Sequence, residues 1–247
     1  MSVHLVGGGW TSGQASAVYG PFLAEAAMLA RARGRSIPHI VVLAVGEDIS
    51  DGTAHAAKFE TALCLAGRLT MVAVVVAEGE QFPAELPEDV DGLLVGGGLT
   101  PAYLSAVAPI RDRVRELVAH GVPYLGFSAG AMIAARHALL GGWLLGGLPV
   151  TDPDNGEDLE QLTVEEGLGL VPVSVDVHAA QRGTLTRLIM AVHSGLTSRG
   201  VAIDEDTVLI MNREGGAVAG AGQVWSVTGG RADPELRILA SGTTLAP

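Results

Sequence analysis

The segment Gly126-Phe127-Ser128-Ala129-Gly130 has the residues of a nucleophile elbow, and it follows directly on an apolar run. In a G-x-S-x-G turn between a strand and a helix, the glycines allow a sharp bend that exposes the serine hydroxyl. The first N–H groups of the following helix, that of Ala129 in particular, are free to bind an oxyanion. The segment therefore predicts a nucleophile at Ser128, and the alternative is a glycine-rich turn with an N-capping serine.

A serine at its ordinary pKa is a weak nucleophile and needs a histidine as base. Of the seven histidines, His178 follows the strand-like run Val173-Ser174-Val175-Asp176-Val177. A strand end of this kind reaches the same carboxyl edge of a parallel sheet as Ser128. His137 lies nine residues after Ser128, about 13.5 Å along a helix, and is a poor candidate. We therefore expect His178 to be the base, and the alternative is a loop histidine with a structural partner.

Two charged residues accompany His178. Asp176 lies two residues earlier on the same face of the strand, which suits an orienting or a substrate-binding group. Arg182 lies four residues later, and on an early-starting helix its guanidinium points along the same face as His178. An arginine there can hold an acidic side chain or a terminal carboxylate. The alternative is a surface arginine paired with nearby acids.

The glycine-rich run Gly7-Gly8-Gly9-Trp10-Thr11-Ser12-Gly13 matches neither common nucleotide-binding pattern. Ser12 stands in place of the third glycine of G-x-G-x-x-G, and no Gly-Lys-Thr/Ser follows. We interpret the run as a loop at the rim of the active site. Trp10 and Tyr19 are candidates for a side-chain pocket there, and the alternative is local aromatic packing.

The elements that must position these residues alternate between strand-like and helix-like segments. Near-continuous apolar runs indicate parallel strands covered on both faces. We expect strands at residues 3–6, 39–45, 69–77, 93–95 and 122–127, and helices at 22–33 (opened by Pro21), 51–67 (capped by Asp51), 100–121 (restarting at Pro109) and 129–140. This order predicts an α/β fold, a three-layer sandwich with a mostly parallel central sheet and helices on both faces.

The C-terminal part of the chain is less regular. Residues 141–167 are rich in Gly, Pro and acids and are expected to form a long loop on the active face. A strand at 171–177 and a helix at 181–194 follow, and then four short strands near Val201, Val208, Val218 and Val224. We expect these strands to complete the sheet as a C-terminal β-hairpin edge. No repeat or linker interrupts the chain, so residues 1–247 are expected to form a single domain.

Composition limits the partners. The chain has 15 basic and 27 acidic side chains, a net charge of −12, and no run of Lys or Arg. Nucleic acids and anionic membranes need a positive footprint, so both are excluded as partners. One cysteine, Cys64, cannot form an internal disulfide, and no run is long and apolar enough to span a membrane. We expect a cytoplasmic location and a small-molecule or peptide partner, and the apolar composition is compatible with a homodimer.

Several motifs in a fixed order resemble the dipeptidase E and cyanophycinase family of serine peptidases. The resemblance covers about residues 90 to 210. Its motifs are Leu94-Val95-Gly96-Gly97-Gly98, the Ser128 segment, Gly167-Leu168-Gly169-Leu170-Val171-Pro172, Asp176-Val177-His178 with Arg182 and Arg187, and Gly200-Val201-Ala202-Ile203-Asp204-Glu205-Asp206-Thr207.

The resemblance implies a flavodoxin-like topology similar to that of class I glutamine amidotransferases, with Ser128 in place of their cysteine. It implies Ser128 as nucleophile, His178 as base, and the backbone amides of Gly98 and Ala129 as the oxyanion hole. No metal or other cofactor is implied, and no Cys/His cluster has metal-ligand spacing.

The family usually places the third catalytic residue, an Asp or Glu, in the loop between the serine and the Gly-Leu-Gly strand. Counting back from Gly167 places this residue at Asp154, with Glu157 or Asp158 as second choices and Asp176 as a further possibility.

The substrate-binding residues implied are Leu99, Asp176, Arg182 and Arg187. Leu99 stands where relatives usually carry Asn or Gln, Val177 where cyanophycinases have Gln, and Thr184 between the two arginines. These replacements remove hydrogen-bonding groups and argue against cyanophycin itself as the substrate.

The function expected from this resemblance is hydrolysis of small, Asp-containing peptides through an acyl-enzyme. Two alternatives remain open at this point. One is an amidase or esterase acting on a non-peptide acyl group. The other is a binding or regulatory module that has kept the fold but lost turnover.

Overall fold

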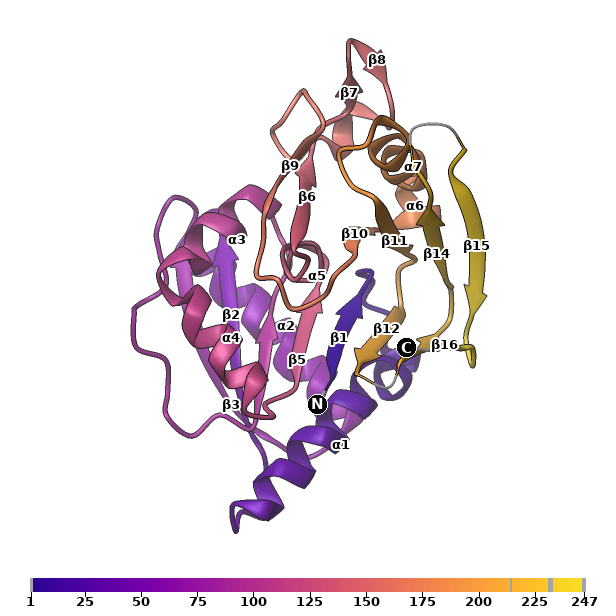
Figure 1. Cartoon of the computed structure of the whole chain (residues 1–247). Helices are drawn as coiled ribbons and strands as arrows, with labels where there is room; N and C mark the ends of the chain where they lie inside the picture. The colour runs from indigo at the N-terminus through magenta and orange to yellow at the C-terminus, as the bar shows by residue number, and fades with distance from the viewer. Residues whose placement is uncertain (1, 214, 231–232, 246–247) are drawn as a thin grey trace.

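The main sheet of the computed structural model has eight strands in the order β16-β13-β12-β1-β5-β4-β2-β3 (Figure 1). The structure describes residues 2–213, 215–230 and 233–245. The five strands from β1 to β3 in this order run parallel, whereas β12, β13 and β16 pair antiparallel at the other side of β1. Their bounds are β1 Val3–Val6, β2 His39–Gly46, β3 Thr70–Ala77, β4 Gly92–Val95, β5 Tyr124–Phe127, β12 Thr207–Asn212, β13 Gly215–Gly220 and β16 Thr244–Leu245.

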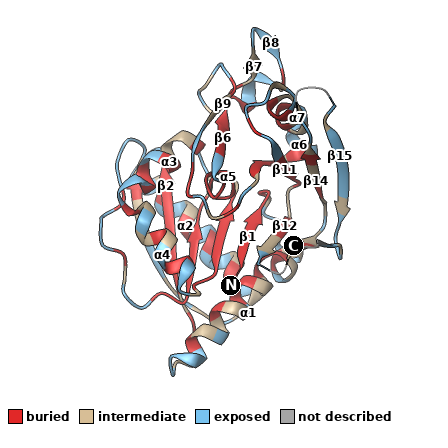
Figure 2. Cartoon of the chain, viewed as in Figure 1, coloured by how far each residue is buried: buried red, intermediate tan, exposed pale blue. Residues whose placement is uncertain are grey.

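Alternate residues of the central strands enter two hydrophobic cores. In β2, Ile40 and Val42 pack with the core that includes Phe22 and Phe59 of the helices α1 (Ala15–Ala32) and α2 (Ile49–Ala66). Val41, Leu43 and Val45 pack on the opposite face, with the helices α3 (Thr100–Val107), α4 (Arg111–Ala119) and α5 (Ala129–Ile133). This period of two, with both faces covered, gives the expected three-layer arrangement. Figure 2 shows the central strands buried (red).

Two helix starts differ from the sequence-based expectation. Pro21 does not open α1 but lies inside it, because the helix starts at Ala15 and buries Ala15, Val18 and Tyr19 against the sheet. Tertiary packing of this apolar stripe outweighs the local effect of proline. Helix α2 is capped by Asp48, which accepts a hydrogen bond from the Asp51 N–H at 2.8 Å, and not by Asp51.

The helix expected at residues 129–140 is wrong beyond its first turns. Helix α5 ends at Ile133, and β6 (His137–Gly141) pairs antiparallel with β9 (Thr163–Glu166). This ladder satisfies the backbone that a continued helix would have paired internally. Between β6 and β9 lie β7 (Leu144–Leu145), β8 (Leu148–Pro149) and the 3-10 turn η3 (Pro153–Asn155).

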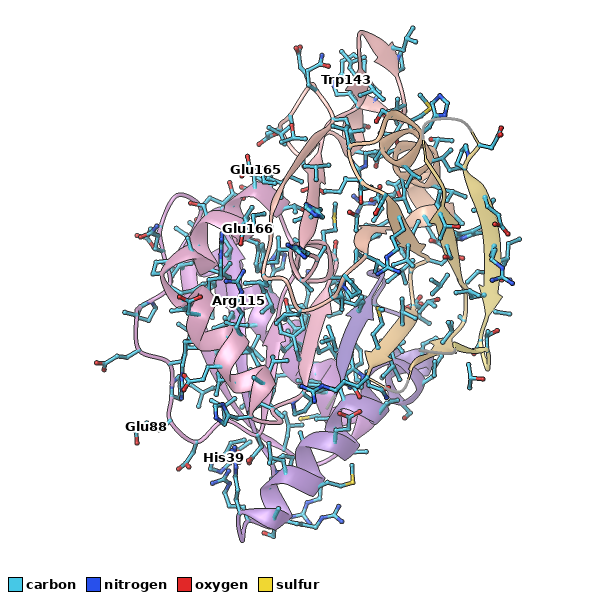
Figure 3. The ribbon with its side chains drawn as sticks, viewed as in Figure 1. His39, Glu88, Arg115, Trp143, Glu165 and Glu166 are labelled. Carbon is cyan, nitrogen blue, oxygen red and sulfur yellow. The ribbon has the colours of Figure 1, made fainter. Side chains whose placement is uncertain are left out.

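Arg115 of α4 contacts the end of β9 and the residues that follow it. Its side chain contacts Glu166 at 3.2 Å and donates to the Leu168 carbonyl at 2.8 Å (Figure 3).

A second sheet of four strands has the order β10-β11-β14-β15. The expectation that all four C-terminal strands complete the main sheet is therefore wrong, because those near Val201 and Val224 belong to this second sheet and only β12 and β13 join the main one. The strands of the second sheet are β10 Ser174–Val177, β11 Arg199–Ile203, β14 Gln223–Thr228 and β15 Glu235–Ala240, and β15 is its exposed edge (Figure 2). The expected helix at 181–194 is divided at Gly183 into α6 (Ala179–Arg182) and α7 (Leu185–Ser194). Two short 3-10 turns, η1 (Ser12–Gln14) and η2 (Ala108–Ile110), complete the elements. Within the described ranges, no helix combines the length and apolarity needed to cross a membrane.

Candidate active site

A cavity of about 730 Å³ opens at the carboxyl ends of the parallel strands. The chain reverses direction across the sheet between β2 and β4, which lie side by side, and such a switch point is where open α/β sheets bind ligands. Loops after β2, β4 and β5 contribute Glu47, Gly98 and Ser128 to the wall. The full lining is Trp10, Val45, Gly46, Glu47, Asp51, His55, Glu78, Gly97, Gly98, Leu99, Phe127, Ser128, Pro153, Asp154, Glu157, Asp158, His178 and Arg182.

Ser128 has a backbone conformation that few non-glycine residues adopt. It lies between β5 and α5 with φ 51° and ψ −110°. A strained serine at this junction is the feature expected of a nucleophile elbow. The bend also requires glycines around it, because a Cβ on Gly97 would lie 2.9 Å from the Ser128 Cβ, and one on Gly126 would lie 2.3 Å from the Gly130 carbonyl oxygen.

His178 contacts the serine directly. Its Nε2 lies 2.9 Å from Ser128 Oγ, and its backbone N–H donates to the Gly7 carbonyl at 3.0 Å. His178 itself has φ 56°, in the left-handed region, at the turn from β10 into α6. Gly8 leaves room for the ring, because a Cβ there would lie 2.1 Å from His178 Cε1. The glycine-rich loop after β1 thus positions the histidine.

Glu205 occupies the other side of the imidazole. Its Oε1 lies 2.7 Å from His178 Nδ1, and its backbone N–H donates to Gln181 Oε1 at 2.9 Å. Strand β11 runs parallel to β10, so the turn after β11 meets the edge where His178 follows β10. With the proton on Nδ1, the neutral imidazole donates to Glu205 and accepts from the serine hydroxyl. The three side chains therefore form a continuous Ser128–His178–Glu205 chain of hydrogen bonds.

Asp154, the first choice for the acid, does not contact His178 in the described structure. It is exposed at the cavity rim in η3, and its backbone N–H donates to Asp152 Oδ1 at 3.0 Å. The second choices also point elsewhere. Glu157 Oε2 accepts from the Thr100 N–H at 2.9 Å, and Asp158 is an exposed residue of the cavity wall. The sequence does hold a signal for Glu205. The residue lies in the segment 200–207, which is part of the resemblance to the peptidase family, and it follows β11 closely.

The pKa of His178 is held below its ordinary value of 6.5. Burial lowers it first, and the nearby positive charge of Arg182 lowers it further, whereas Glu205 acts in the opposite direction without overcoming them. The imidazole is therefore neutral near pH 7 and able to accept a proton.

Asp176 and Arg187, expected to bind substrate, form a buried ion pair instead. Their side chains are 0% and 2% exposed. Arg187 Nε donates to Asp176 Oδ2 at 2.9 Å, and its Nη2 donates to Oδ1 at 2.7 Å. The remaining end of the guanidinium donates to the Asn155 carbonyl at 2.5 Å. Neither residue lines the cavity, because Arg187 of α7 packs on Asp176 of β10. The sequence pattern does not show this packing.

The other expected substrate residues do line the cavity. Leu99 precedes α3 with its side chain at the wall, and Arg182 is exposed at the end of α6. No acid pairs with the Arg182 guanidinium among the described residues. Among the residues that the structure describes, the Gly98 N–H has no hydrogen-bond acceptor, and Ala129 contributes the first N–H of α5.

Glu157 lies half-buried in the wall of this cavity. Burial raises its pKa, and the hydrogen bond from Thr100 and the charge of Arg187 oppose that shift only in part. Elsewhere on the wall the charge is mostly negative, from Glu47, Asp51 and Glu78 near α2. In the described ranges, no three His, Cys, Asp or Glu side chains are grouped so that they could share a metal ion.

Comparison with known proteins identifies relatives over the region that holds the site. The sequence model of peptidase family S51 matches residues 50–218, more than half of the chain. Cyanophycinases from Nostoc sp. (strain PCC 7120) and Trichormus variabilis are each 33% identical over 144 residues, or 56% of this chain and 44% of theirs. The match thus spans less than half the length of these curated relatives.

Two solved structures share the fold over nearly the whole chain. A peptidase from an acI-B1 Actinobacterium has a TM-score of 0.63 at 16% identity, over 99% of this chain and 96% of its own. A putative peptidase E from Listeria monocytogenes EGD-e has a TM-score of 0.52 at 14% identity, over 90% and 98%. At these identities the likeness establishes the peptidase E-like α/β fold and not the substrate.

Proposed function

Because the chain belongs to peptidase family S51, a family of serine peptidases, we propose that it hydrolyses small peptides with Ser128 as nucleophile. The observation that carries the proposal is the contact of Ser128 Oγ with His178 Nε2 at 2.9 Å, with Glu205 2.7 Å behind the same ring. A capping serine in a glycine-rich turn needs neither partner.

In this mechanism His178 takes the hydroxyl proton as Ser128 Oγ attacks the scissile carbonyl carbon. The protonated imidazole then gives that proton to the leaving amine, the C–N bond breaks, and an ester to Ser128 remains. A water molecule gives a proton to His178 and attacks the ester, and return of the proton to Ser128 frees the acid product. Glu205 holds the ring in the tautomer that accepts at Nε2 and stabilises the charged imidazolium.

The oxyanion hole is proposed at the N–H groups of Gly98 and Ala129. The Gly98 amide lies in the turn after β4 and follows Gly97, which lies against Ser128, and the amide of Ala129 starts α5. Donors fixed by the backbone stabilise a developing oxyanion without reorganising, which is commonly the largest single contribution to acyl transfer. Gly97 supports this arrangement, because any side chain there would displace Ser128.

We assign the acid-recognising role to Arg182 and a positioning role to the Asp176–Arg187 pair. Arg182 lines the cavity without an acidic partner among the described residues, and its guanidinium can hold the carboxylate of an Asp side chain bidentately. The buried pair instead links β10, which ends at His178, to α7 and to Asn155 of the long loop. Asp-containing dipeptides are therefore the substrates proposed.

The direct test is the mass of the protein after reaction with a fluorophosphonate, for the wild type and for Ser128→Ala and His178→Ala. We expect one adduct on Ser128, absent from the first variant and formed at least about 10²-fold more slowly in the second. Cleavage of Asp-X dipeptides, compared with simple esters, then separates a peptidase from an esterase. A folded wild type that gains no adduct on long exposure contradicts the proposed nucleophile and leaves a binding module.

A further inference from the structure

A second cavity, of about 380 Å³, lies next to the active-site cavity and plays no part in the mechanism above. Trp10 lines both cavities. Most of the other lining residues are apolar or carry short polar groups. The lining comprises Gly9, Trp10, Thr11, Ser12, Gln14, Ala15, Val18, Tyr19, Lys58, Thr61, Ala62, Leu65 and Asp206. We call it the Lys58 pocket.

The Trp10 indole is a fixed wall between the two cavities. It is 46% exposed, yet its ring packs on Phe59 at 4.9 Å and on Phe127 at 4.6 Å between centroids. Phe127 is the residue before Ser128, so this aromatic stack links the wall to the nucleophile. An exposed indole anchored in this way offers a rigid apolar surface to a ligand.

One stripe of helix α2 forms the floor of both cavities. Asp51 and His55 line the active-site cavity, whereas Lys58, Ala62 and Leu65 line the Lys58 pocket. These residues recur every three or four positions and therefore lie on one face of the helix. The stripe extends about 21 Å from Asp51 to Leu65, and Lys58 follows His55 by about 4.5 Å along the axis. A ligand that lies along α2 passes directly from one cavity to the other.

The charge along this stripe changes sign between Asp51 at its start and Lys58 at its middle. Glu47, Asp51 and Glu78 give the active-site cavity a negative wall. In the other pocket the positive group is Lys58, the single lysine of the sequence, for which the described residues provide no ion-pair partner.

Asp206, the acid of the same lining, forms no ion pair with Lys58 in the described structure. Its carboxylate accepts from the Thr11 N–H at 3.0 Å and from Thr11 Oγ1 at 2.6 Å. A peptide has the matching polarity, with an ammonium group at one end and a carboxylate at the other.

We propose that the Lys58 pocket is the subsite for the leaving-group side of the substrate, and that it takes an apolar side chain from a residue whose terminal carboxylate meets Lys58. The inference rests on the proposed peptidase function and adds the substrate class: short peptides with an apolar C-terminal residue. The acidic wall then faces the amino end of the peptide. The apolar surface of Trp10, Val18 and Leu65 receives the side chain, and Ser128 lies between the two ends.

Paired peptides test the subsite by turnover. Each N-terminal residue is offered as X-Leu and X-Gly, as X-Gly-Leu and X-Gly-Gly, and as X-Leu amide. For whichever X is cleaved, we expect kcat/KM about tenfold or more higher with Leu than with Gly, because an apolar group in a matching pocket gains at least this much. For X-Leu amide, kcat/KM should be up to about fivefold lower than for X-Leu, because the amide lacks the carboxylate that forms an exposed ion pair with Lys58. This difference should be seen only while Lys58 is present.

Two variants report on the pocket itself. Ala62→Phe fills it and should abolish the preference for Leu over Gly. Ala57→Phe is the matched control, since Ala57 is exposed on α2 and lines neither cavity, and it should keep the preference. Lys58→Ala should make Leu peptide and Leu amide equal, and Lys58→Arg should restore the difference.

A measurement without turnover uses the single lysine. In Ser128→Ala protein labelled with [¹⁵N]lysine, one backbone amide signal reports on residue 58. Asp-Leu should shift it at lower concentration than Asp-Gly or Asp-Leu amide. If Ser128 takes the fluorophosphonate and peptides are cleaved, but Leu and Gly peptides are equivalent and the signal does not respond, the subsite is refuted and the peptidase function stands. If no adduct forms and no peptide is cleaved, it is the proposed function that fails.

Discussion

The buried pair of Asp176 and Arg187 gives a quantitative prediction that separates positioning from substrate binding. Three hydrogen bonds of 2.9, 2.7 and 2.5 Å satisfy the guanidinium in a place that is almost free of water. Burial alone would lower the pKa of Arg187, but the charge of Asp176 outweighs it and raises the pKa. The arginine therefore stays charged, and removing its partner leaves that charge buried without compensation.

We expect Asp176→Ala to lower the free energy of unfolding by about 3–5 kcal/mol. For a chain of this size, at about 2–4 °C per kcal/mol, the melting temperature should fall by roughly 6–20 °C. Asp176→Leu combined with Arg187→Met replaces the pair by apolar groups of similar volume, and its stability should return close to that of the wild type.

The assay is urea and thermal unfolding, together with the rate of fluorophosphonate reaction at Ser128. In the double variant this rate should stay within a few-fold of the wild-type rate, because neither side chain touches the reacting atoms. Single variants as stable as the wild type, but with a raised KM for Asp peptides, would refute the reasoning and return both residues to the substrate site.

Three further predictions concern the histidine and one distant carboxylate. Gly8→Ala should slow the fluorophosphonate reaction of Ser128 by about 10²-fold or more, because a Cβ there would lie 2.1 Å from His178 Cε1. A Gly8→Ala enzyme that reacts at the wild-type rate would show that the loop does not position the ring. The reaction needs neutral His178, whose pKa is below 6.5, so the rate should persist below pH 6.5. Arg182→Met should move the acid limb of the pH–rate profile to higher pH, because it removes a charge that lowers this pKa. An acid limb that does not move would contradict this electrostatic link. Asp91 is buried, yet hydrogen bonds from Arg35 and the His39 N–H, together with the charge of Arg35, outweigh burial and lower its pKa. Asp91→Asn should lower the free energy of urea unfolding by about 1–3 kcal/mol at pH 7, and this difference should shrink as the pH falls from 3.8 through the lowered pKa. An equal difference at both ends of that pH range would contradict the prediction.

The sequence predicts the fold best where local pattern and tertiary packing agree. Apolar runs such as residues 39–45 form central strands because both faces of the sheet are covered, and their composition already implies this. The prediction fails beyond Ile133, where alanines and leucines suggest a continued helix but residues 137–141 form β6. The partner of this strand, β9, is more than twenty residues away, so no local signal could reveal the pairing.

The site residues, like the elements of the fold, could be predicted from the sequence only in part. Ser128 and His178 could be proposed from the sequence because each directly follows a strand. The expectation that both strands share one sheet edge is wrong, since β5 lies in the eight-stranded sheet and β10 in the four-stranded sheet. Glu205 also follows a strand, but its role depends on β11 lying beside β10 in a second sheet, which the sequence pattern does not specify. Asp176 and Arg187 were matched as motif residues. Their burial depends on how α7 packs, and this cannot be derived from spacing.

The most direct measurement compares the rate of fluorophosphonate reaction at Ser128 in Glu205→Gln and Asp154→Asn. The structure places Glu205 2.7 Å from His178 Nδ1 and Asp154 exposed at the rim. We predict that Glu205→Gln slows the reaction by about 10²- to 10⁴-fold, through loss of the group that fixes the tautomer, whereas Asp154→Asn stays within about twofold of the wild type. The opposite order, with Asp154→Asn slow and Glu205→Gln unaffected, would contradict a catalytic chain of Ser128, His178 and Glu205.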